Sequence, residues 1–524
     1  MNSQDMKTMP YILSSVTLPS FCSSPCQRIS KEAALLVFVT QHLLSLLYNG
    51  RSLSSFHSLN MRASALLVAL TAWMAVTPMA VGVQLNARIS DPTVDPFYQG
   101  PSGFESKAPG TILRQRQINA SFFGFIPNPV EAWQLLFRTT AINGSAIAGV
   151  TTVFKPAFPQ KDRFVSFQTA YDSSSPTCDP SYTYQLGSPQ TDLISSLEAL
   201  ILQVYLLKGY IVASTDYEGP DAAFSPGRLE GVGVLDGMRA VSNFYETLGF
   251  STDQPDIVGV GYSGGAIATG WAASLHPTYA PELSIKGWVH GGTPSNLTGT
   301  MSHIDNTICS GFIPAAIDGL AKPSAYGAEL HAFIDEVFTD EGKSILDYAG
   351  SHCAVITLFN FMDKSILSTD IQSLGSNFLY NPGVAAVLAK NIMGVNKTET
   401  PTAPAYVYHA ANDEIIPYSN ATETVKAWCE NGANVKFTNF AAGGHVTTEI
   451  IAIPSAVEQV DNFFAGNLTT GCTSDEVLSD SLDPLALGLN LEPILAELLT
   501  ALGNLGDNDS NLKSNVSILK DIIS

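Results

Sequence analysis

Apolar and polar residues along the central part of the chain alternate between two periodicities. Short apolar runs typical of buried strands are separated by longer segments in which apolar residues recur at helical spacing. Two of the runs flank Asn143-Gly144, a dipeptide that favours a tight hairpin turn. The pattern predicts strands at 132–140, 146–154, 163–171, 210–215 and 285–290, and helices at 192–207 and 231–248. Alternating strands and helices predict an α/β fold with a mostly parallel central sheet covered on both faces.

The alternation is interrupted between residues 295 and 390, where no convincing strand is predicted. Helical segments are expected there instead, at 313–320, 326–338 and 344–349. The alternation then resumes, with strands at 405–410 and 434–440 and helices at 421–430 and 447–464. We interpret the interruption as a helical cap, or lid, of the kind that excludes water from a site. An ordinary set of surface helices is the alternative.

One glycine-rich turn lies between a predicted strand that contains Val258 and a helix at 266–275 that is rich in small residues. Its sequence, Gly261-Tyr262-Ser263-Gly264-Gly265, matches the G-x-S-x-G pattern of a nucleophile elbow. Such an elbow presents the serine hydroxyl above the sheet. We expect glycine at 261 and 265 because a Cβ atom there would collide with the helix packed against the strand. A plain tight turn is the alternative interpretation.

A serine becomes a useful nucleophile when a base removes its proton and an acid orients that base. Asp413 follows the predicted strand at 405–410. His445 follows the strand at 434–440 and begins a helix. Because folds with this elbow have the chain order serine, acid, histidine, we predict that Ser263, Asp413 and His445 form a catalytic triad. Glu414 is the alternative acid, and Asp413 is preferred because it comes first after the strand.

The negative charge that develops during acyl transfer needs two hydrogen-bond donors. The N–H of Gly264 is one, because this residue follows the nucleophile. The other is expected in the loop after the strand at 163–171, which contains Asp172 and does not resemble an HGGG loop. We predict that Asp172 donates through its backbone N–H or through a protonated carboxyl group. A role in capping the loop is the alternative.

The composition narrows the class of protein. Of the 524 residues 45% are hydrophobic and 14% are charged, which is sufficient for a large core. The formal net charge of −21 argues against nucleic acids and anionic membranes as partners and suits a soluble extracellular protein. The sequence contains no evident cluster of metal ligands, so we predict no metal and no organic cofactor. No stable protein partner is implied.

The amino-terminal region predicts secretion. Residues 61–82 combine the basic Arg62, an apolar stretch at 63–76 and small residues near Ala80, as a signal peptide does. We interpret residues 1–60 as a leader that is non-native or disordered, with translation starting at Met61. An amino-terminal anchor is the alternative.

Sequons and cysteines agree with an extracellular location. Five cysteines follow the signal peptide, and because their spacings match no metal motif we expect disulfides, with one cysteine left over. Potential N-glycosylation sequons lie at Asn119, Asn143, Asn296, Asn396, Asn420, Asn467, Asn508 and Asn515. The tail after Cys472 is acidic and contains regularly placed leucines. The expected organisation is a leader (1–60), a signal peptide (61–82), a core (83–294), a cap (295–390), a second core part (391–472) and a tail or flap (473–524).

Several longer stretches between about residues 95 and 450 resemble the fungal secretory lipase family, the lipase A type known from Candida. They are DPFYQGPSGFESKAPGTILRQR, QTAYDSSSPTCDPSY, STDYEGP, VGYSGGAIATGWAASLHPTYAPEL, HAANDEIIPY and GGHVTTEI. The resemblance implies an α/β-hydrolase fold with a lid over an acyl tunnel, the triad named above, and an oxyanion hole at Asp172 and Gly264. It also implies the disulfides Cys178–Cys353 and Cys429–Cys472, with Cys309 left over.

The function implied by the resemblance is that of a secreted serine lipase or carboxylesterase. Such an enzyme would hydrolyse acylglycerol esters through an acyl-enzyme intermediate, on lipid substrates that include those at an oil–water interface. One alternative keeps the chemistry but acts on acetylated secondary metabolites as a deacetylase. A non-catalytic hydrolase-like binding protein is an alternative of another class, and a peptidase that shares the fold is a further one.

Overall fold

The computed structural model describes residues 89–124, 126–189, 192–467 and 470–479, all within the unit Leu85–Ser524. The predicted leader, the signal peptide, most of the tail and the sequons at Asn508 and Asn515 lie outside the described residues. Within the described part of the chain, no helix is long and apolar enough to cross a membrane.

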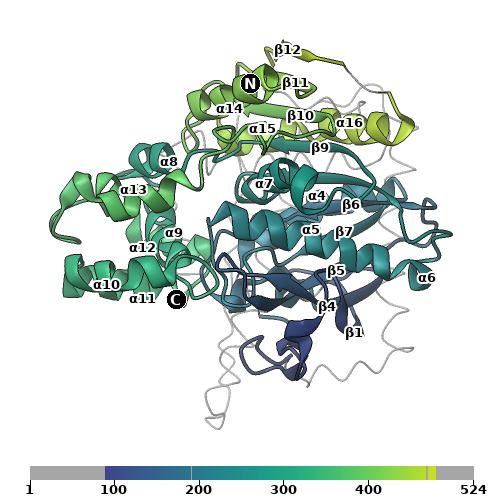
Figure 1. Ribbon diagram of the computed structural model, residues 1–524, viewed down its shortest axis with the longest axis horizontal. Helices are drawn as coiled ribbons and strands as arrows, with labels where there is room; N and C mark the ends of the chain where they lie inside the picture. The colour runs from purple at the N-terminus through teal and green to yellow at the C-terminus, as the bar shows by residue number, and fades with distance from the viewer. Residues whose placement is uncertain (1–88, 125, 190–191, 468–469, 480–524) are drawn as a thin grey trace, which may run out of the picture. The chain divides into compact units, whose positions relative to one another are not determined.

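A ten-stranded sheet runs through the molecule in the order β1-β4-β5-β7-β6-β8-β9-β10-β11-β12 (Figure 1). From β7 onward all neighbouring strands are parallel, and β1, β4 and β5 add an antiparallel edge. The mostly parallel α/β sheet predicted from the sequence is confirmed. The strands are β1 (Ile112–Ile118), β4 (Glu131–Thr140), β5 (Ala146–Lys155), β6 (Arg163–Gln168), β7 (Ile211–Thr215), β8 (Asp256–Tyr262), β9 (Ile285–Gly291), β10 (Ala405–Ala410), β11 (Val435–Phe440) and β12 (Cys472–Val477). A small second sheet pairs β2 (Ser121–Phe122) with β3 (Ile126–Pro127).

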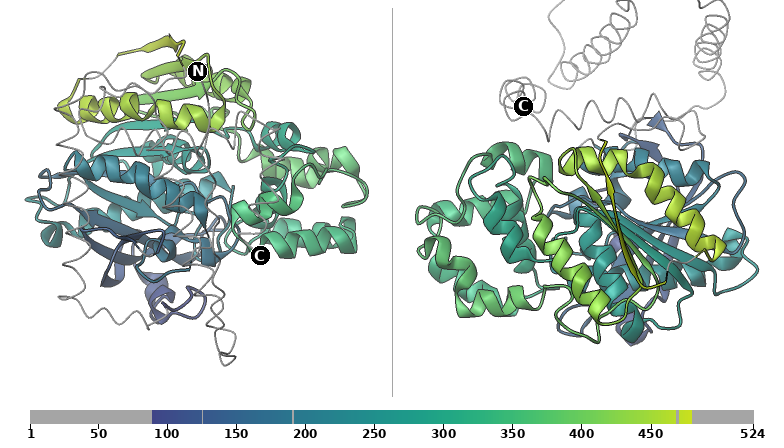
Figure 2. Two further views of the ribbon diagram at one scale, coloured as in Figure 1. Left: turned by 180° about the vertical axis from the view of Figure 1, so that it is seen from behind. Right: turned by 90° about the horizontal axis from the view of Figure 1, so that it is seen from above.

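Helices cover both faces of the sheet (Figure 2). One face carries α5 (Gly227–Asn243), α7 (Gly264–Tyr279) and α14 (Tyr418–Glu430), and the other carries α4 (Leu193–Leu207), α15 (His445–Ile451) and α16 (Ile453–Ala465). Every residue of β7 and β10 is buried, as expected for strands covered on both sides. Three tryptophans are fully buried on the face of the sheet that carries α5, α7 and α14: Trp271, Trp288 and Trp428. Burial of each side chain stabilises the fold by about 1.5–3 kcal/mol or more.

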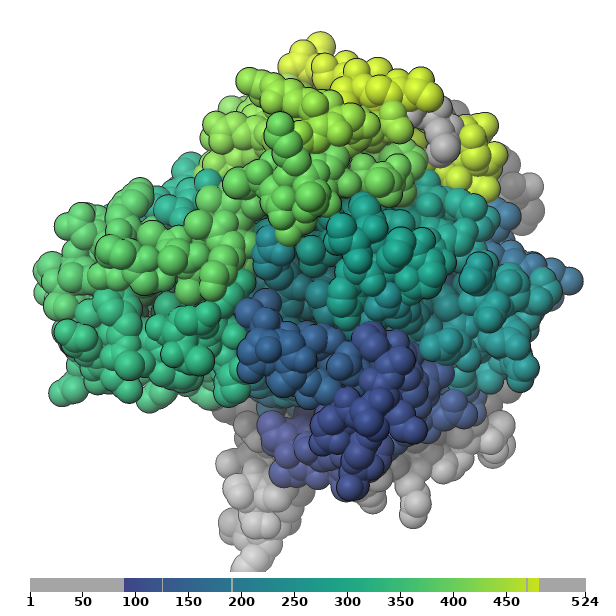
Figure 3. Space-filling view, in the orientation of Figure 1, coloured from purple at the N-terminus to yellow at the C-terminus, as the bar shows by residue number. Residues whose placement is uncertain are grey.

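The chain between β9 and β10 folds into helices that gather at one side of the core (Figures 1 and 3). They are α8 (Leu297–Ile304), α9 (Phe312–Leu320), α10 (Gly327–Val337), α11 (Asp340–Ala349), α12 (Ala354–Phe361) and α13 (Pro382–Ala389). We call these helices the cap. Their apolar faces join the core on the α5–α7 side of the sheet, which is why this segment has helical periodicity without the strands found elsewhere.

Several elements differ from the sequence-based expectations, and three of the differences have a clear physical reason. β1 is absent from the strands predicted above, because its polar residues obscure the alternation typical of a strand. β12 extends the sheet beyond Cys472 into residues assigned to the tail, and most of its side chains are exposed. The helix expected at 447–464 is two helices that meet at Ala452, because Pro454 favours the first turn of a new helix.

Two disulfides connect distant parts of the chain. Cys178 and Cys353 join a short helix after β6, η4 (Pro176–Cys178), to the start of α12 in the cap. Cys429 and Cys472 join α14 to β12 at the edge of the sheet. Both pairings are those implied by the family resemblance, and Cys309 is buried and belongs to neither bridge.

Removing the Cys178–Cys353 bridge should destabilise the protein more than removing the other bridge. The first closes a loop of 175 residues and the second a loop of 43, so the chain-entropy difference is about 1 kcal/mol. Thermal unfolding of the two double alanine variants would measure the difference. Equal unfolding temperatures would show that the link between cap and core is not a principal constraint.

Candidate active site

Ser263 occupies a strained turn between β8 and α7. Its backbone lies at φ 50° and ψ −120°, a region that a residue with a side chain rarely adopts. A Cβ atom at Gly261 would lie 2.3 Å from the carbonyl oxygen of Gly265 in the first turn of α7, which confirms the expected collision with the helix. At Gly265 a Cβ atom would instead lie 2.0 Å from the carbonyl oxygen of Gln168, so the collision there is with β6 and not with the helix.

A chain of hydrogen bonds leads away from the serine. Nε2 of His445 lies 2.8 Å from Oγ of Ser263, and Nδ1 of His445 lies 2.7 Å from Oδ2 of Asp413. The three residues follow β8, β11 and β10, whose carboxyl ends meet at one edge of the parallel sheet. The structure therefore brings together all three residues of the predicted triad.

Glu414 contacts the same histidine through a different atom. Its carboxylate accepts a hydrogen bond from the backbone N–H of His445, at 2.8 Å. It therefore satisfies a donor at the start of α15, while Asp413 contacts the imidazole ring. Of the two acids considered from the sequence, Asp413 is the one positioned to orient the ring.

The charges of the pair support proton transfer. Burial by itself raises the pKa of Asp413, but His445 and His409 hold that pKa well below its usual range. Burial lowers the pKa of His445, whereas the charge and hydrogen bond of Asp413 raise it above its ordinary value. An ionised carboxylate thus stands ready to stabilise the imidazolium that forms when His445 takes a proton.

Asp172 lies against the backbone that follows the serine. A Cβ atom at Gly264 would be 1.7 Å from Oδ1 of Asp172, an oxygen that is buried and has no hydrogen-bond partner among the described residues. Burial raises the pKa of this carboxyl group to about 7, with His445 opposing and Glu449 adding to the increase. The group can therefore hold a proton near neutral pH. Of the two donors considered from the sequence, this favours the carboxyl group.

Asp172 is one of several buried acids behind the site. Burial also raises the pKa of Asp192, at the start of α4, and of Asp216, after β7, to about 7 in each case. Glu198 of α4 has a pKa well above the ordinary value because of its burial and its hydrogen bond with Glu449. Burial therefore favours the protonated form of each of these acids relative to an exposed carboxyl group.

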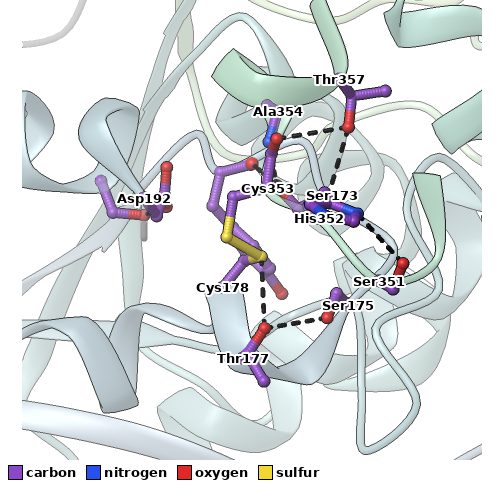
Figure 4. Close-up of a disulfide and its surroundings, with 12 residues drawn as sticks. Ser173, Ser175, Thr177, Cys178, Asp192, Ser351, His352, Cys353, Ala354 and Thr357 are labelled. Carbon is purple, nitrogen blue, oxygen red and sulfur yellow. Dashed lines mark hydrogen bonds between the residues drawn. A yellow bond between two sulfur atoms is a disulfide. The ribbon is translucent and has the colours of Figure 1, made fainter. Parts of the chain in front are cut away.

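The loop that carries Asp172 is fastened to the cap (Figure 4). Oγ of Ser173 accepts a hydrogen bond from the N–H of Ala354 at 2.9 Å, and the bridge Cys178–Cys353 lies beside it. Ala354 is the first residue of α12. The loop and the cap are therefore held in register by a hydrogen bond and a covalent bond.

A pocket is lined by Ser263 and by residues of the cap. Most of its walls are apolar and come from α8, α9 and the loop after Asp413. Its lining consists of Asp172, Phe224, Ser225, Ser263, Gly264, Ile267, Pro294, Leu297, Thr300, Met301, Ile304, Phe312, Ile313, Ala316, Ile415 and Ile416. Such walls favour an apolar group of a ligand next to the nucleophile.

Sequence reasoning missed two contributors to this site. His409 lies 3.1 Å from the carboxylate of Asp413. Its spacing of four residues from the acid and its place in a strand were visible signals, but the contact depends on how the turn folds back. Ile416 supports the acid with its backbone N–H, and no sequence pattern indicates this.

The predicted glycosylation sites differ in exposure. Asn119, Asn143, Asn396 and Asn467 are exposed. Asn296 is partly buried, where its side chain caps α8 by accepting a hydrogen bond from Gly299, and Asn420 packs against the same glycine. Of the six sequons within the described residues, the four exposed ones are those that a glycan can reach without disturbing a helix. Within the described residues, no group of three or more His, Cys, Asp or Glu side chains is arranged to hold a metal ion.

Comparison with known proteins gives consistent matches. The family model described as secretory lipase matches residues 184–471. A secreted triacylglycerol lipase of Malassezia furfur, LIP1, is 41% identical over 78% of this chain and 83% of its own length, and LIP2 of that organism is 39% identical over 84% and 94%. The X-ray structure of Candida antarctica lipase A is 30% identical, has a TM-score of 0.70, and is matched over 79% of this chain and 96% of its own.

Replacing Gly264 by alanine should displace Asp172. The new Cβ atom would overlap Oδ1, so we expect a loss of about 1–3 kcal/mol in stability and a fall in esterase activity on the order of 10²-fold. Gly383→Ala in α13 is the matched control, because its Cβ atom would meet an atom only at 3.5 Å. Unchanged activity in folded Gly264→Ala would contradict the close contact with Asp172.

Proposed function

The chain belongs to the secretory lipase family, and from this premise we propose that it is a secreted triacylglycerol lipase whose catalytic triad is Ser263, His445 and Asp413. The observation that carries the proposal is the hydrogen-bond chain from Ser263 to Asp413, in which Ser263 lines an apolar pocket. The names of the Malassezia relatives support triacylglycerols as the substrate class and secretion as the destination.

The proposed reaction begins when Oγ of Ser263 attacks the ester carbonyl and its proton passes to Nε2 of His445. The carbonyl oxygen becomes an oxyanion that accepts hydrogen bonds from the N–H of Gly264 and the protonated carboxyl group of Asp172. His445 then gives its proton to the departing alcohol, which leaves Ser263 acylated. A water molecule then gives a proton to His445 and attacks the acyl carbonyl. The bond to Oγ of Ser263 breaks, His445 returns the proton to this oxygen, and the fatty acid is released.

The substrate class follows from the pocket. The acyl chain lies against the residues of α8 and α9, whose apolar atoms gain by excluding water. This favours a lipase over a deacetylase, since an acetyl group would leave most of these walls uncovered. The cap forms part of the binding surface and shields the acyl-enzyme from solvent.

Ser263→Ala should lose activity on every ester by about 10³-fold or more, because the nucleophile is removed. The test compares hydrolysis of p-nitrophenyl acetate, butyrate and palmitate by the wild type and this variant. We expect palmitate to be hydrolysed by the wild type only. Activity confined to acetate would favour the deacetylase, and a folded wild type inactive on all three esters would refute the proposal.

Asp172→Asn should remove part of the pH dependence. In the wild type, kcat/KM should decline as pH rises through about 7, because Asp172 loses the proton it donates and gains a charge that repels the oxyanion. Asparagine donates at every pH, so the variant should lack this alkaline decline. Measured pH profiles of equal shape for the two proteins would show that the donor is the backbone N–H.

A further inference from the structure

A second histidine contacts the carboxylate of Asp413. His409 lies in β10 with 0% of its surface exposed, and its Nε2 is 3.1 Å from Oδ2 of Asp413. The same oxygen is 2.7 Å from Nδ1 of His445. Two imidazole rings therefore share one carboxylate oxygen, and His445 is the ring that reaches Ser263.

The position of the hydrogen on His409 follows from its neighbours. Nε2 also lies 3.1 Å from the carbonyl oxygen of Ile416. A carbonyl oxygen and an ionised carboxylate only accept hydrogen bonds, so Nε2 has to be the nitrogen that carries the hydrogen. Nδ1 is buried and has no hydrogen-bond partner among the described residues, so the single hydrogen of the ring stays on Nε2, where these two oxygens share it.

The same contacts tie the turn of Asp413 to the sheet. Oδ1 of Asp413 accepts hydrogen bonds from the N–H groups of Ile415 and Ile416, at 2.9 and 2.7 Å. His409 contacts both Oδ2 and the carbonyl of Ile416, and it belongs to a strand paired on both sides by β9 and β11. The turn that follows Asp413 is therefore held by its own hydrogen bonds and by a contact with β10 in the interior of the sheet.

We propose that His409 is a positioning residue for the reaction: its Nε2–H fixes the rotamer of the Asp413 carboxylate and draws part of the carboxylate's charge away from His445. The proposal rests on the proposed function of the triad. The terminal torsion of an aspartate is broad, so the direction of Oδ2 has to be set by its donors. A triad acid pointing a few tenths of an ångström away from Nδ1 would orient the ring less well.

The effect of His409 on the charge of Asp413 matters because the acids around His445 all raise the pKa of that histidine. Burial lowers the pKa of His445, but Asp413, Glu414 and Glu449 all raise it. A second donor on Oδ2 restrains this increase, because it stabilises the carboxylate without the help of His445. The titratable groups that face the pair His409–Asp413 come from five elements: His445 from α15, Glu414 from the loop, His290 from β9, Tyr418 from α14 and Tyr262 from β8.

His290 does not supply the same effect. It lies on β9 next to His409, and burial, followed by His409, lowers its pKa to about 3. Its Nδ1 lies 2.8 Å from the hydroxyl of Thr293. His290 is therefore uncharged at ordinary pH and is bonded to a different group.

The test uses two substitutions of similar size, His409→Gln and His409→Met. Glutamine can place an N–H near the position of Nε2, and methionine cannot donate a hydrogen bond. His276→Met is the matched control, because His276 is also buried and contacts a backbone carbonyl, that of Leu283 at 3.3 Å. For each full-length protein, kcat, KM and the pH profile of kcat/KM on p-nitrophenyl butyrate are measured, together with thermal unfolding.

We expect His409→Met to lower kcat by about 10–100-fold, the range typical of a lost hydrogen bond to a charged group, with KM little changed. The acid limb of its profile should move to higher pH, since His445 would then hold its proton more tightly. His409→Gln should recover most of kcat and the wild-type profile. His276→Met should change only the unfolding temperature.

Three results would overturn the proposal: wild-type kcat and pH profile in folded His409→Met, equal impairment of the glutamine and methionine variants, or an equal loss in His276→Met. Should His409→Met fail to fold, ¹⁵N NMR of the wild type still decides, because a hydrogen on Nδ1 of His409 would contradict the geometry. Asp413→Asn tests the triad separately and should lower kcat by about 10⁴-fold. If that loss is observed while His409→Met behaves as the wild type, the role of His409 is refuted and the triad is not.

Discussion

The position of the nucleophile depends on how closely α7 packs against its neighbours. On one side, no Cβ atom fits at Gly261, because the first turn of α7 lies directly against the end of β8. On the other side, a Cβ atom at Gly231 of α5 would lie 2.7 Å from the backbone of Trp271. α7 is therefore held between β8 and α5, with its backbone in close contact with both elements. This packing maintains the strained φ of Ser263, which an isolated turn would relax.

Much of the central fold could be predicted because its strands are buried on both faces and its helices are amphipathic. The strand at 405–410 was predicted at the observed bounds of β10, and Asp413 was assigned from its place after that strand. The triad followed from chain order, since parallel strands end at one edge of the sheet. Local sequence patterns were sufficient to predict the strands and helices whose burial requires apolar residues at regular positions.

The rest could not be predicted, for physical reasons. β12 is polar and mostly exposed, so its residues show no hydrophobic pattern that would predict a strand. Its pairing with β11 is evident only from the structure. The cap was recognised as helical, but the way its helices form a pocket depends on packing between them. The contact of His409 with Asp413 depends on a turn in which the Asp413 side chain accepts hydrogen bonds from the N–H groups of Ile415 and Ile416, and the sequence does not reveal that this turn brings the acid back to β10.

The buried carboxyl groups link folding to the proton concentration of the surroundings. Asp172, Asp192 and Asp216 have pKa values of about 7 in the folded protein, whereas an unfolded chain releases these protons near pH 4. Folding at a pH between these values therefore takes up protons from solution. By linkage, the stabilisation from these groups is fully present below about pH 4 and is lost as pH rises through about 7. These three side chains therefore contribute more to the stability of the native state at acidic pH than at alkaline pH.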